Sequence, residues 1–232
     1  MMGMISALCL RDAFTQTARI VRLGYEGLLL GGGLAVLSSC ASEAPNSYAA
    51  GVSIELSHDR AETISNVHYD LIFSIPSDVS DPVRGTAIIN FILTRAGNVV
   101  LDFAQSPNHV LSVRANGGDA EYVVKDEHIT IGNVPAGHAS VEIEFVSGDR
   151  SLNRQADFMY TLFVPDRARF TFPVFDQPNL KARYELALEI PADWRAVANG
   201  GRLSREVDGE RATVLFRETD FISSYLFSFV AG

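Results

Sequence analysis

The chain has 232 residues, of which 47% are hydrophobic and 20% charged, so it can bury the core of one large or two small domains. Its formal net charge of -9 excludes a broad nucleic-acid-binding surface, because such surfaces neutralise phosphates with Lys and Arg. Its two cysteines, Cys9 and Cys40, both lie near the N-terminus. A disulfide framework and a thiolate zinc site in the body of the chain are therefore excluded.

The N-terminal segment predicts export. Residues 28–37 read LLLGGGLAVL, and Arg19 and Arg22 precede them. A basic segment before an apolar run too short to span a bilayer is typical of a signal peptide. The alternative is a buried helix with an incidental cysteine, but three glycines interrupt the run and polar sequence follows it. We therefore expect residues 1–39 to be a signal peptide.

The apolar run leads into the sequence LSSC, which ends at Cys40 and resembles a bacterial lipobox. A lipobox implies that the Cys40 thiol receives diacylglycerol and becomes the first residue of the mature protein. The residues that follow are small and polar, so we expect residues 40–60 to be a flexible tether. Ala41, directly after the cysteine, favours the outer membrane of a Gram-negative host. The expected location is thus a membrane-anchored lipoprotein, in the outer membrane or at the periplasmic face.

From residue 64 onward the hydrophobic pattern has a period of two, which predicts strands with one buried face. Turn signals such as NGG at residues 116–118 and DG at residues 208–209 separate the runs. We expect an all-β fold, an antiparallel sandwich or a large curved sheet, with at most one helical turn, at residues 152–158. The side chains expected to face the core are Val67, Tyr69, Leu71, Phe73, Ile75, Ala87, Ile89, Phe91, Leu93, Val141, Ile143, Phe145, Tyr184, Leu186, Leu188, Ile190, Tyr225, Phe227 and Phe229.

The segment at residues 160–184 reads YTLFVPDRARFTFPVFDQPNLKARY and is the most informative of the chain. Pro173 and Pro178 lack a backbone donor, so the corner at residues 172–178 cannot pair fully within a sheet. We expect its two phenylalanines to anchor it in apolar surface. Asp176 can accept backbone N–H bonds in an Asx-type turn ahead of Pro178. A strand-connecting corner without chemistry of its own is the preferred interpretation of this segment.

The same segment resembles the N-terminal domain of the aminopeptidase N family of zinc metallopeptidases. The elements that carry the resemblance are RAR at 167–169, FPVFDQP at 172–178, KARY at 181–184, IPADW at 190–194, ANG at 198–200 and ISSYLFSFVAG at 222–232. They occur in the family's order. The resemblance implies an N-terminal β domain at residues 61–232 that shapes the substrate cleft of an enzyme removing N-terminal residues from peptides.

The family holds its zinc with a helical H-E-x-x-H, whose histidines share one helix face, and a distant Glu. This chain contains no such motif, and none of its five histidines, at positions 58, 68, 109, 128 and 138, stands four residues from another. We expect these histidines to be solvated or structural. The chain itself then carries no cofactor and is inactive alone, with zinc held by a catalytic domain that is absent here.

In many relatives the N-terminal domain contributes a Gln-x-Glu whose carboxylate helps to hold the free amine of the substrate. Alignment on the FP at residues 172–173 places these positions at Leu162 and Val164. Both are apolar, so a carboxylate anchor is not expected here. Asp166 is the nearest acid, and we expect it to form a surface pair with a loop Arg.

Two hypotheses remain. In the first, the chain is the non-catalytic N-terminal domain of an exported zinc aminopeptidase, with the catalytic domain, peptide substrates and a lipid anchor as its partners. In the second, it is a free-standing surface lipoprotein that binds peptide or protein through the same sandwich. An exposed apolar patch of more than roughly a few hundred Å² near Phe229 would favour the first, because such patches usually mark an interface.

Overall fold

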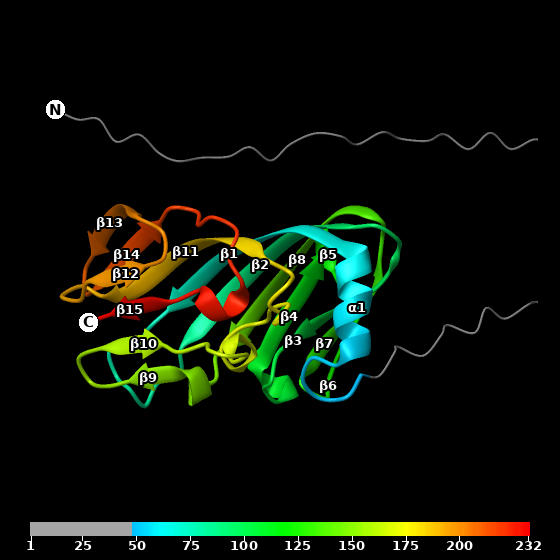
Figure 1. The fold of residues 1–232 in the computed structure, drawn as a ribbon. Helices are drawn as coiled ribbons and strands as arrows, with labels where there is room; N and C mark the ends of the chain where they lie inside the picture. Colours follow the sequence, from blue (N-terminus) through cyan, green and yellow to red (C-terminus); the bar gives the residue numbers. More distant parts are fainter. Residues whose placement is uncertain (1–47) are drawn as a thin grey trace, which may run out of the picture. The chain divides into compact units, whose positions relative to one another are not determined.

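The computed structural model describes residues 48–232, so the predicted signal peptide and Cys40 lie outside the described residues. Within this part, three β-sheets and the helix α1 (Ile54–Thr63) enclose one hydrophobic core (Figure 1). The expected all-β class is confirmed. No helix between residues 48 and 232 is long and apolar enough to cross a membrane.

The largest sheet has eight strands in the order β13-β14-β11-β1-β2-β8-β4-β5. Their bounds are β1 Ile64–Ser74, β2 Arg84–Leu93, β4 Val110–Ala115, β5 Gly118–Asp119, β8 Gly137–Val146, β11 Ala182–Pro191, β13 Arg202–Asp208 and β14 Arg211–Phe216. Neighbouring strands are antiparallel except β1 and β11, which run parallel with Tyr69 opposite Tyr184. The sheet is therefore mixed, whereas the sequence predicts antiparallel pairing throughout. Parallel neighbours need a long connection, here the chain from β2 to β10.

Two smaller sheets accompany it. One has the order β12-β15-β10-β9 and the other β3-β7-β6. The bounds are β3 Gly97–Asp102, β6 Tyr122–Lys125, β7 His128–Val134, β9 Leu152–Arg154, β10 Met159–Thr161, β12 Ala196–Ala198 and β15 Phe229–Ala231. Four short 3-10 helices connect strands: η1 Pro107–His109, η2 Asp149–Ser151, η3 Ala168–Phe170 and η4 Ser224–Leu226.

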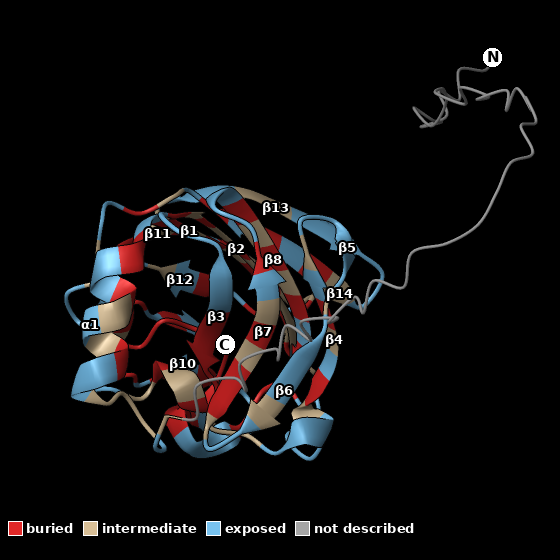
Figure 2. Ribbon diagram, turned by 90° about the vertical axis from the view of Figure 1, so that its right-hand side faces the viewer, coloured by how far each residue is buried: buried red, intermediate tan, exposed pale blue. Residues whose placement is uncertain are grey.

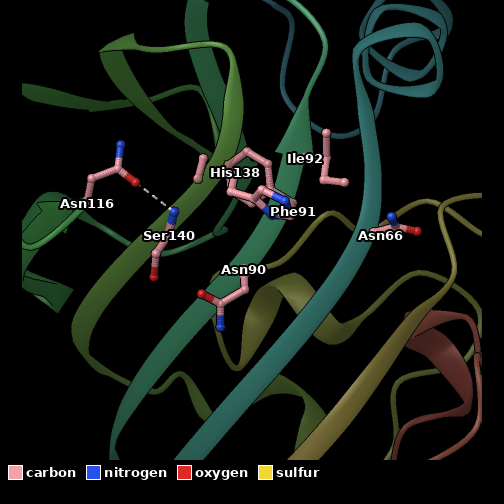
Figure 3. A pocket seen from close by; sticks show the side chains of 8 residues that line it. Asn66, Asn90, Phe91, Ile92, Asn116, His138 and Ser140 are labelled. Atoms are coloured by element: carbon pink, nitrogen blue, oxygen red, sulfur yellow. Dashed lines mark hydrogen bonds between the residues drawn. The ribbon is translucent and has the colours of Figure 1, made fainter.

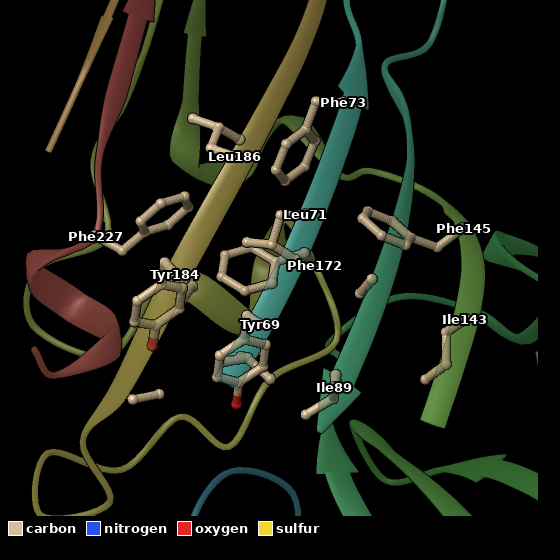
Figure 4. Close-up of a cluster of buried hydrophobic side chains, with 14 of the residues drawn as sticks. Tyr69, Leu71, Phe73, Ile89, Ile143, Phe145, Phe172, Tyr184, Leu186 and Phe227 are labelled. Atoms are coloured by element: carbon tan, nitrogen blue, oxygen red, sulfur yellow. The ribbon is translucent and has the colours of Figure 1, made fainter. Parts of the chain in front are cut away.

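The core lies where both small sheets cover one face of the large sheet. The Phe73 ring contacts Phe145 within the large sheet and Phe229 of β15, with ring centroids 5.9 and 5.1 Å apart. Phe103, just after β3, contacts Phe145 at 5.8 Å. Figure 4 shows Phe73 and Phe145 together with Phe172, whose ring centroid lies 6.1 Å from that of Phe73. Buried and exposed residues alternate along the strands (Figure 2), which confirms the period of two.

The flexible tether expected at residues 40–60 is wrong from Ile54 onward, because the helix α1 begins there. Ser53 caps the helix by accepting a hydrogen bond from the Leu56 backbone N–H at 3.2 Å, which satisfies one of the free donors of the first turn. Leu56 and Arg60 are buried against the rest of the domain. A ten-residue helix is marginal alone, so this one depends on tertiary contacts that the sequence pattern does not reveal.

Two further expectations are wrong in detail. The last run forms η4 followed by the short strand β15, so Tyr225 lies in a 3-10 turn and is only half-buried. Phe227 and Phe229 are buried as expected. The helical turn considered at residues 152–158 is instead strand β9 and a loop.

Candidate functional site

The outward face of the four-stranded sheet is apolar. The strand register places Val197 of β12 opposite Val230 of β15, and Val230 opposite Tyr160 of β10. Their side chains are 64%, 41% and 38% exposed, respectively, while the strand residues that flank Tyr160 and Val230 are buried. Alternation along each strand thus turns this row away from the core. We call the row of Tyr160, Val230 and Val197 the apolar face.

Aromatic and basic side chains extend the apolar face. The Phe158 ring stacks on Tyr160 with centroids 6.4 Å apart and an interplanar angle of 5°. Arg154 and Arg167 line a shallow hollow together with Tyr160 and Leu162. Aromatic residues and arginine are enriched in protein interfaces, so the composition of this region is that of an interface.

The two positions that the family resemblance singles out, Leu162 and Val164, follow β10 and are 51% and 52% exposed. Both are accessible, and neither offers a charge to an amine. The carboxylate of Asp166 forms an ion pair with Arg169, with Oδ2 2.9 Å from Nη1. The expected surface pair of Asp166 with a loop Arg is confirmed. Contact of Leu162 and Val164 with substrate stays a prediction.

The corner at residues 172–178 is held by a buried carboxylate. Asp176 Oδ2 accepts the Arg169 backbone N–H at 3.1 Å, and Oδ1 accepts the Ser224 hydroxyl at 2.6 Å. The predicted acceptor role of Asp176 is confirmed, but its donors come from η3 and η4, not from a local Asx turn. Burial raises the pKa of the Asp176 carboxyl above its ordinary value, while these two hydrogen bonds act in the opposite direction.

A second buried carboxylate, Asp102 at the end of β3, lies beneath the corner. Arg60 of α1 donates to its two oxygens at 2.8 and 2.9 Å, and the Asp176 backbone N–H donates to Oδ2 at 2.8 Å. His128 Nε2 lies 3.3 Å from Oδ1. Burial favours a higher pKa for Asp102, but Arg60 and the hydrogen bonds from His128 and Asp176 outweigh it, so the pKa lies below its ordinary value.

This network joins α1, β3, β7, the corner and η4, and all of its charged groups are buried. Its geometry therefore suits a structural role, as expected for the corner. Sequence reasoning missed Arg60 and Asp102, because residues so far apart in the chain carry no local signal of their contact.

A polar hollow opens on the outer surface of the large sheet (Figure 3). Its lining residues include Asn66, Asn90, Asn116, His138 and Ser140. The hydrogen bond drawn in Figure 3 runs from the Ser140 backbone N–H to Asn116 Oδ1 at 3.0 Å. No carboxylate lines this hollow, and His138 is the single ionisable side chain among its lining residues.

The comparison with family models decides the identity of the domain. The model described as the peptidase M1 N-terminal domain matches residues 65–226, which is more than half of the chain. The chain belongs to the peptidase M1 N-terminal domain family. The resemblance inferred from the FPVFDQP corner is thereby confirmed.

Relatives of this M1 N-terminal domain are longer proteins. Aminopeptidase M1-D of Oryza sativa subsp. japonica is 28% identical over 180 residues, which cover 68% of this chain and 19% of the relative. Aminopeptidase M1 of Arabidopsis thaliana is 36% identical over 72 residues, covering 31% of this chain and 8% of the relative. The chain thus spans about a fifth or less of the curated relatives it matches.

Solved structures show the same fold for this M1 N-terminal domain. An M1 zinc metallopeptidase from Deinococcus radiodurans superposes with a TM-score of 0.65 at 19% identity, over 73% of this chain and 42% of that one. A two-domain M1 zinc metallopeptidase bound to L-tryptophan superposes with a TM-score of 0.64 at 19% identity, over 73% of this chain and 43% of that one. The comparisons give no support to the free-standing lipoprotein alternative.

Proposed function

We propose that this M1 N-terminal domain belongs to an exported zinc aminopeptidase and that the catalytic domain of that enzyme packs on the apolar face. The observation that carries the proposal is the exposed row of Tyr160, Val230 and Val197. Exposed apolar patches rimmed by polar residues mark interaction sites. The curated relatives are named aminopeptidases, and a solved neighbour is a two-domain M1 zinc metallopeptidase. These names support a zinc peptidase domain as the partner that covers the apolar face.

The catalytic zinc does not fit the residues of this chain. The chain contains no H-E-x-x-H, and two of its histidines bond to backbone carbonyls, His109 to Val146 and His128 to Gly51, each at 2.9 Å. Zinc would therefore be held by the catalytic domain, and no step of peptide hydrolysis is assigned to this chain. Its contribution is to form one wall of the peptide cleft, with Leu162 and Val164 at the edge and amine recognition supplied elsewhere.

Export and lipid anchoring complete the proposal. The basic segment, the apolar run at residues 28–37 and the lipobox-like LSSC support modification of Cys40, because this order of segments is that of an exported chain. The anchored enzyme would then act on peptides outside the cytoplasm, in the outer membrane or at the periplasmic face.

The proposal is tested first on the transcript. We expect the complete reading frame to encode H-E-x-x-H and a distant Glu downstream of the FPVFDQP corner, and its product to hydrolyse amino-acid arylamides in a chelator-sensitive way. The purified 232-residue chain is expected to show no such hydrolysis. A complete reading frame without the motif, or chelator-sensitive turnover by the chain alone, would overturn the proposal.

The apolar face is tested in the protein of the complete reading frame. Val230→Lys places a charge in the proposed interface and is expected to lower the stability of domain docking, measured as faster cleavage between the domains in limited proteolysis. Leu203→Lys is the matched control, because Leu203 is 58% exposed and lies on β13 of the eight-stranded sheet, outside the apolar face. Equal cleavage rates in both variants would contradict the assigned interface.

A further inference from the structure

On the outer surface of the large sheet, three side chains from separate segments converge. His68 comes from β1, Glu185 from β11, and Glu218 from the segment just after β14. One ligand atom of each, an imidazole nitrogen or a carboxylate oxygen, lies within 4.8 Å of the other two. His68 and Glu185 belong to the eight-stranded sheet, whereas the apolar face belongs to the four-stranded sheet, so an inference drawn from this cluster does not rest on the proposed docking of a catalytic domain.

The position of His68 Nε2 points to a ligand. This nitrogen is shielded from solvent and has no hydrogen-bond partner, although Glu218 Oε2 lies only 3.3 Å away. A buried nitrogen without a partner costs free energy. Two ligand atoms bound tetrahedrally to zinc at about 2.0–2.2 Å lie roughly 3.3–3.6 Å apart. The two atoms therefore already have the spacing of adjacent metal ligands.

The surroundings of His68 match the outer shell of a metal site. Its other ring nitrogen, Nδ1, lies 3.5 Å from Asp70 Oδ1. Asp70 is itself oriented by Asn90, whose side-chain amide donates to Oδ2 at 3.2 Å. Histidine ligands usually direct their second ring N–H at a carboxylate, which fixes the tautomer that leaves Nε2 free to bind.

The two carboxylate oxygens of Glu218 have different neighbours. Arg183 donates a hydrogen bond to Oε1, which leaves Oε2 facing His68. Glu185 is exposed, and one of its carboxylate oxygens lies within 4.8 Å of a ligand atom of His68 and of Glu218.

We propose that His68, Glu185 and Glu218 bind a divalent transition-metal ion of the zinc class, with Asp70 and Arg183 as outer-shell residues. Imidazole suits zinc and related ions, while the two carboxylates offset the charge of a dication. Such an ion would link β1, β11 and the segment after β14. It would thus stabilise the large sheet where its parallel pair lies.

Isothermal titration of the 232-residue chain with zinc chloride tests the site, in a Cys9→Ser, Cys40→Ser background that removes thiolate ligands. We expect saturable binding of one ion per chain. His68→Gln and Glu218→Gln should each lower the affinity at least tenfold, and Asp70→Asn roughly 10–100-fold. His138→Gln is the matched control, because His138 lies on the same sheet surface in the hollow of Figure 3, and it should leave the affinity unchanged.

A second measurement separates binding from folding. Zinc should raise the midpoint of thermal unfolding of the parent chain and not that of His68→Gln, since a ligand that binds only the native state stabilises it. Glu185→Gln changes an exposed side chain and should lower the affinity at least tenfold without altering the far-UV circular dichroism. The proposal would be overturned by the absence of saturable binding up to roughly millimolar zinc, or by an affinity of His68→Gln or Glu185→Gln equal to that of the parent chain. The cluster would then be a network of ion pairs without a metal.

Discussion

Arg60 binds both carboxylate oxygens of Asp102, with nitrogen–oxygen distances of 2.8 and 2.9 Å, although 42 residues separate them in the chain. Both side chains are almost fully buried. Arg60 also donates to the Val100 carbonyl at 2.8 and 3.1 Å, so its charge is compensated by several acceptors. The pair fastens α1 to β3 beneath the FPVFDQP corner.

Arg60→Met is expected to lower the free energy of unfolding by about 3–5 kcal/mol, because removal of one partner leaves the Asp102 carboxylate buried and unpaired. Urea denaturation of the 232-residue chain measures it. Arg95→Met is the control, since Arg95 pairs with Asp59 at the surface and exposed pairs contribute roughly 0–1 kcal/mol. Losses of similar size in both variants would contradict the role assigned to Arg60.

The pH dependence of stability follows from Asp102. Its pKa is lowered in the folded state, so the unfolded chain binds more protons in the acid range. Asp102 therefore contributes stability that is present above its unfolded pKa and is lost as the pH falls through the folded value. Asp176 has a raised pKa, so its contribution has the opposite sign and declines as the pH rises.

We expect Asp102→Asn to flatten the acid side of the stability profile, measured as the free energy of unfolding from about pH 5 downward. Asp176→Asn should make stability fall more steeply on the acid side. The raised pKa of Asp176 adds stability as the pH falls, and this substitution removes that contribution. Parallel profiles for Asp102→Asn and the parent chain would show that other carboxylates govern acid unfolding.

Tyr69→Phe tests the anchor of the corner. The Tyr69 hydroxyl accepts the Phe175 backbone N–H at 2.9 Å in the core. Its loss leaves that donor buried without a partner, which should destabilise the chain by about 1–3 kcal/mol in chemical denaturation. Tyr184→Phe is the comparison, because the Tyr184 ring stacks on Tyr69 with centroids 4.9 Å apart but supports no backbone donor of the corner in the described part of the chain. An equal cost would count against the hydrogen bond.

Cys40→Ala is expected to abolish metabolic lipid labelling of the expressed chain and to shift it from the membrane pellet to the soluble fraction, because a thioether-linked diacylglycerol is its proposed anchor. Cys9→Ala serves as the control and should leave both measurements unchanged. Membrane recovery and lipid labelling of Cys40→Ala at parental levels would contradict the lipobox.

Local pattern was enough to predict much of the fold. The inward sets such as Val67, Tyr69 and Leu71 are buried as expected, because strand geometry sends alternate side chains to opposite faces whatever the partner strand is. The corner at residues 172–178 was equally readable, since its prolines exclude regular pairing, and its sequence was sufficient to indicate the family.

Contacts between distant segments were decided only by the tertiary structure. The parallel pairing of β1 with β11, the docking of α1 through Arg60 and Asp102, and the meeting of His68, Glu185 and Glu218 all join segments far apart in the chain. Hydrophobic periodicity specifies which face of an element is buried but not which element lies beside it. The sequence thus determined the strands, the corner and the absence of H-E-x-x-H, and the tertiary structure decided which polar groups meet.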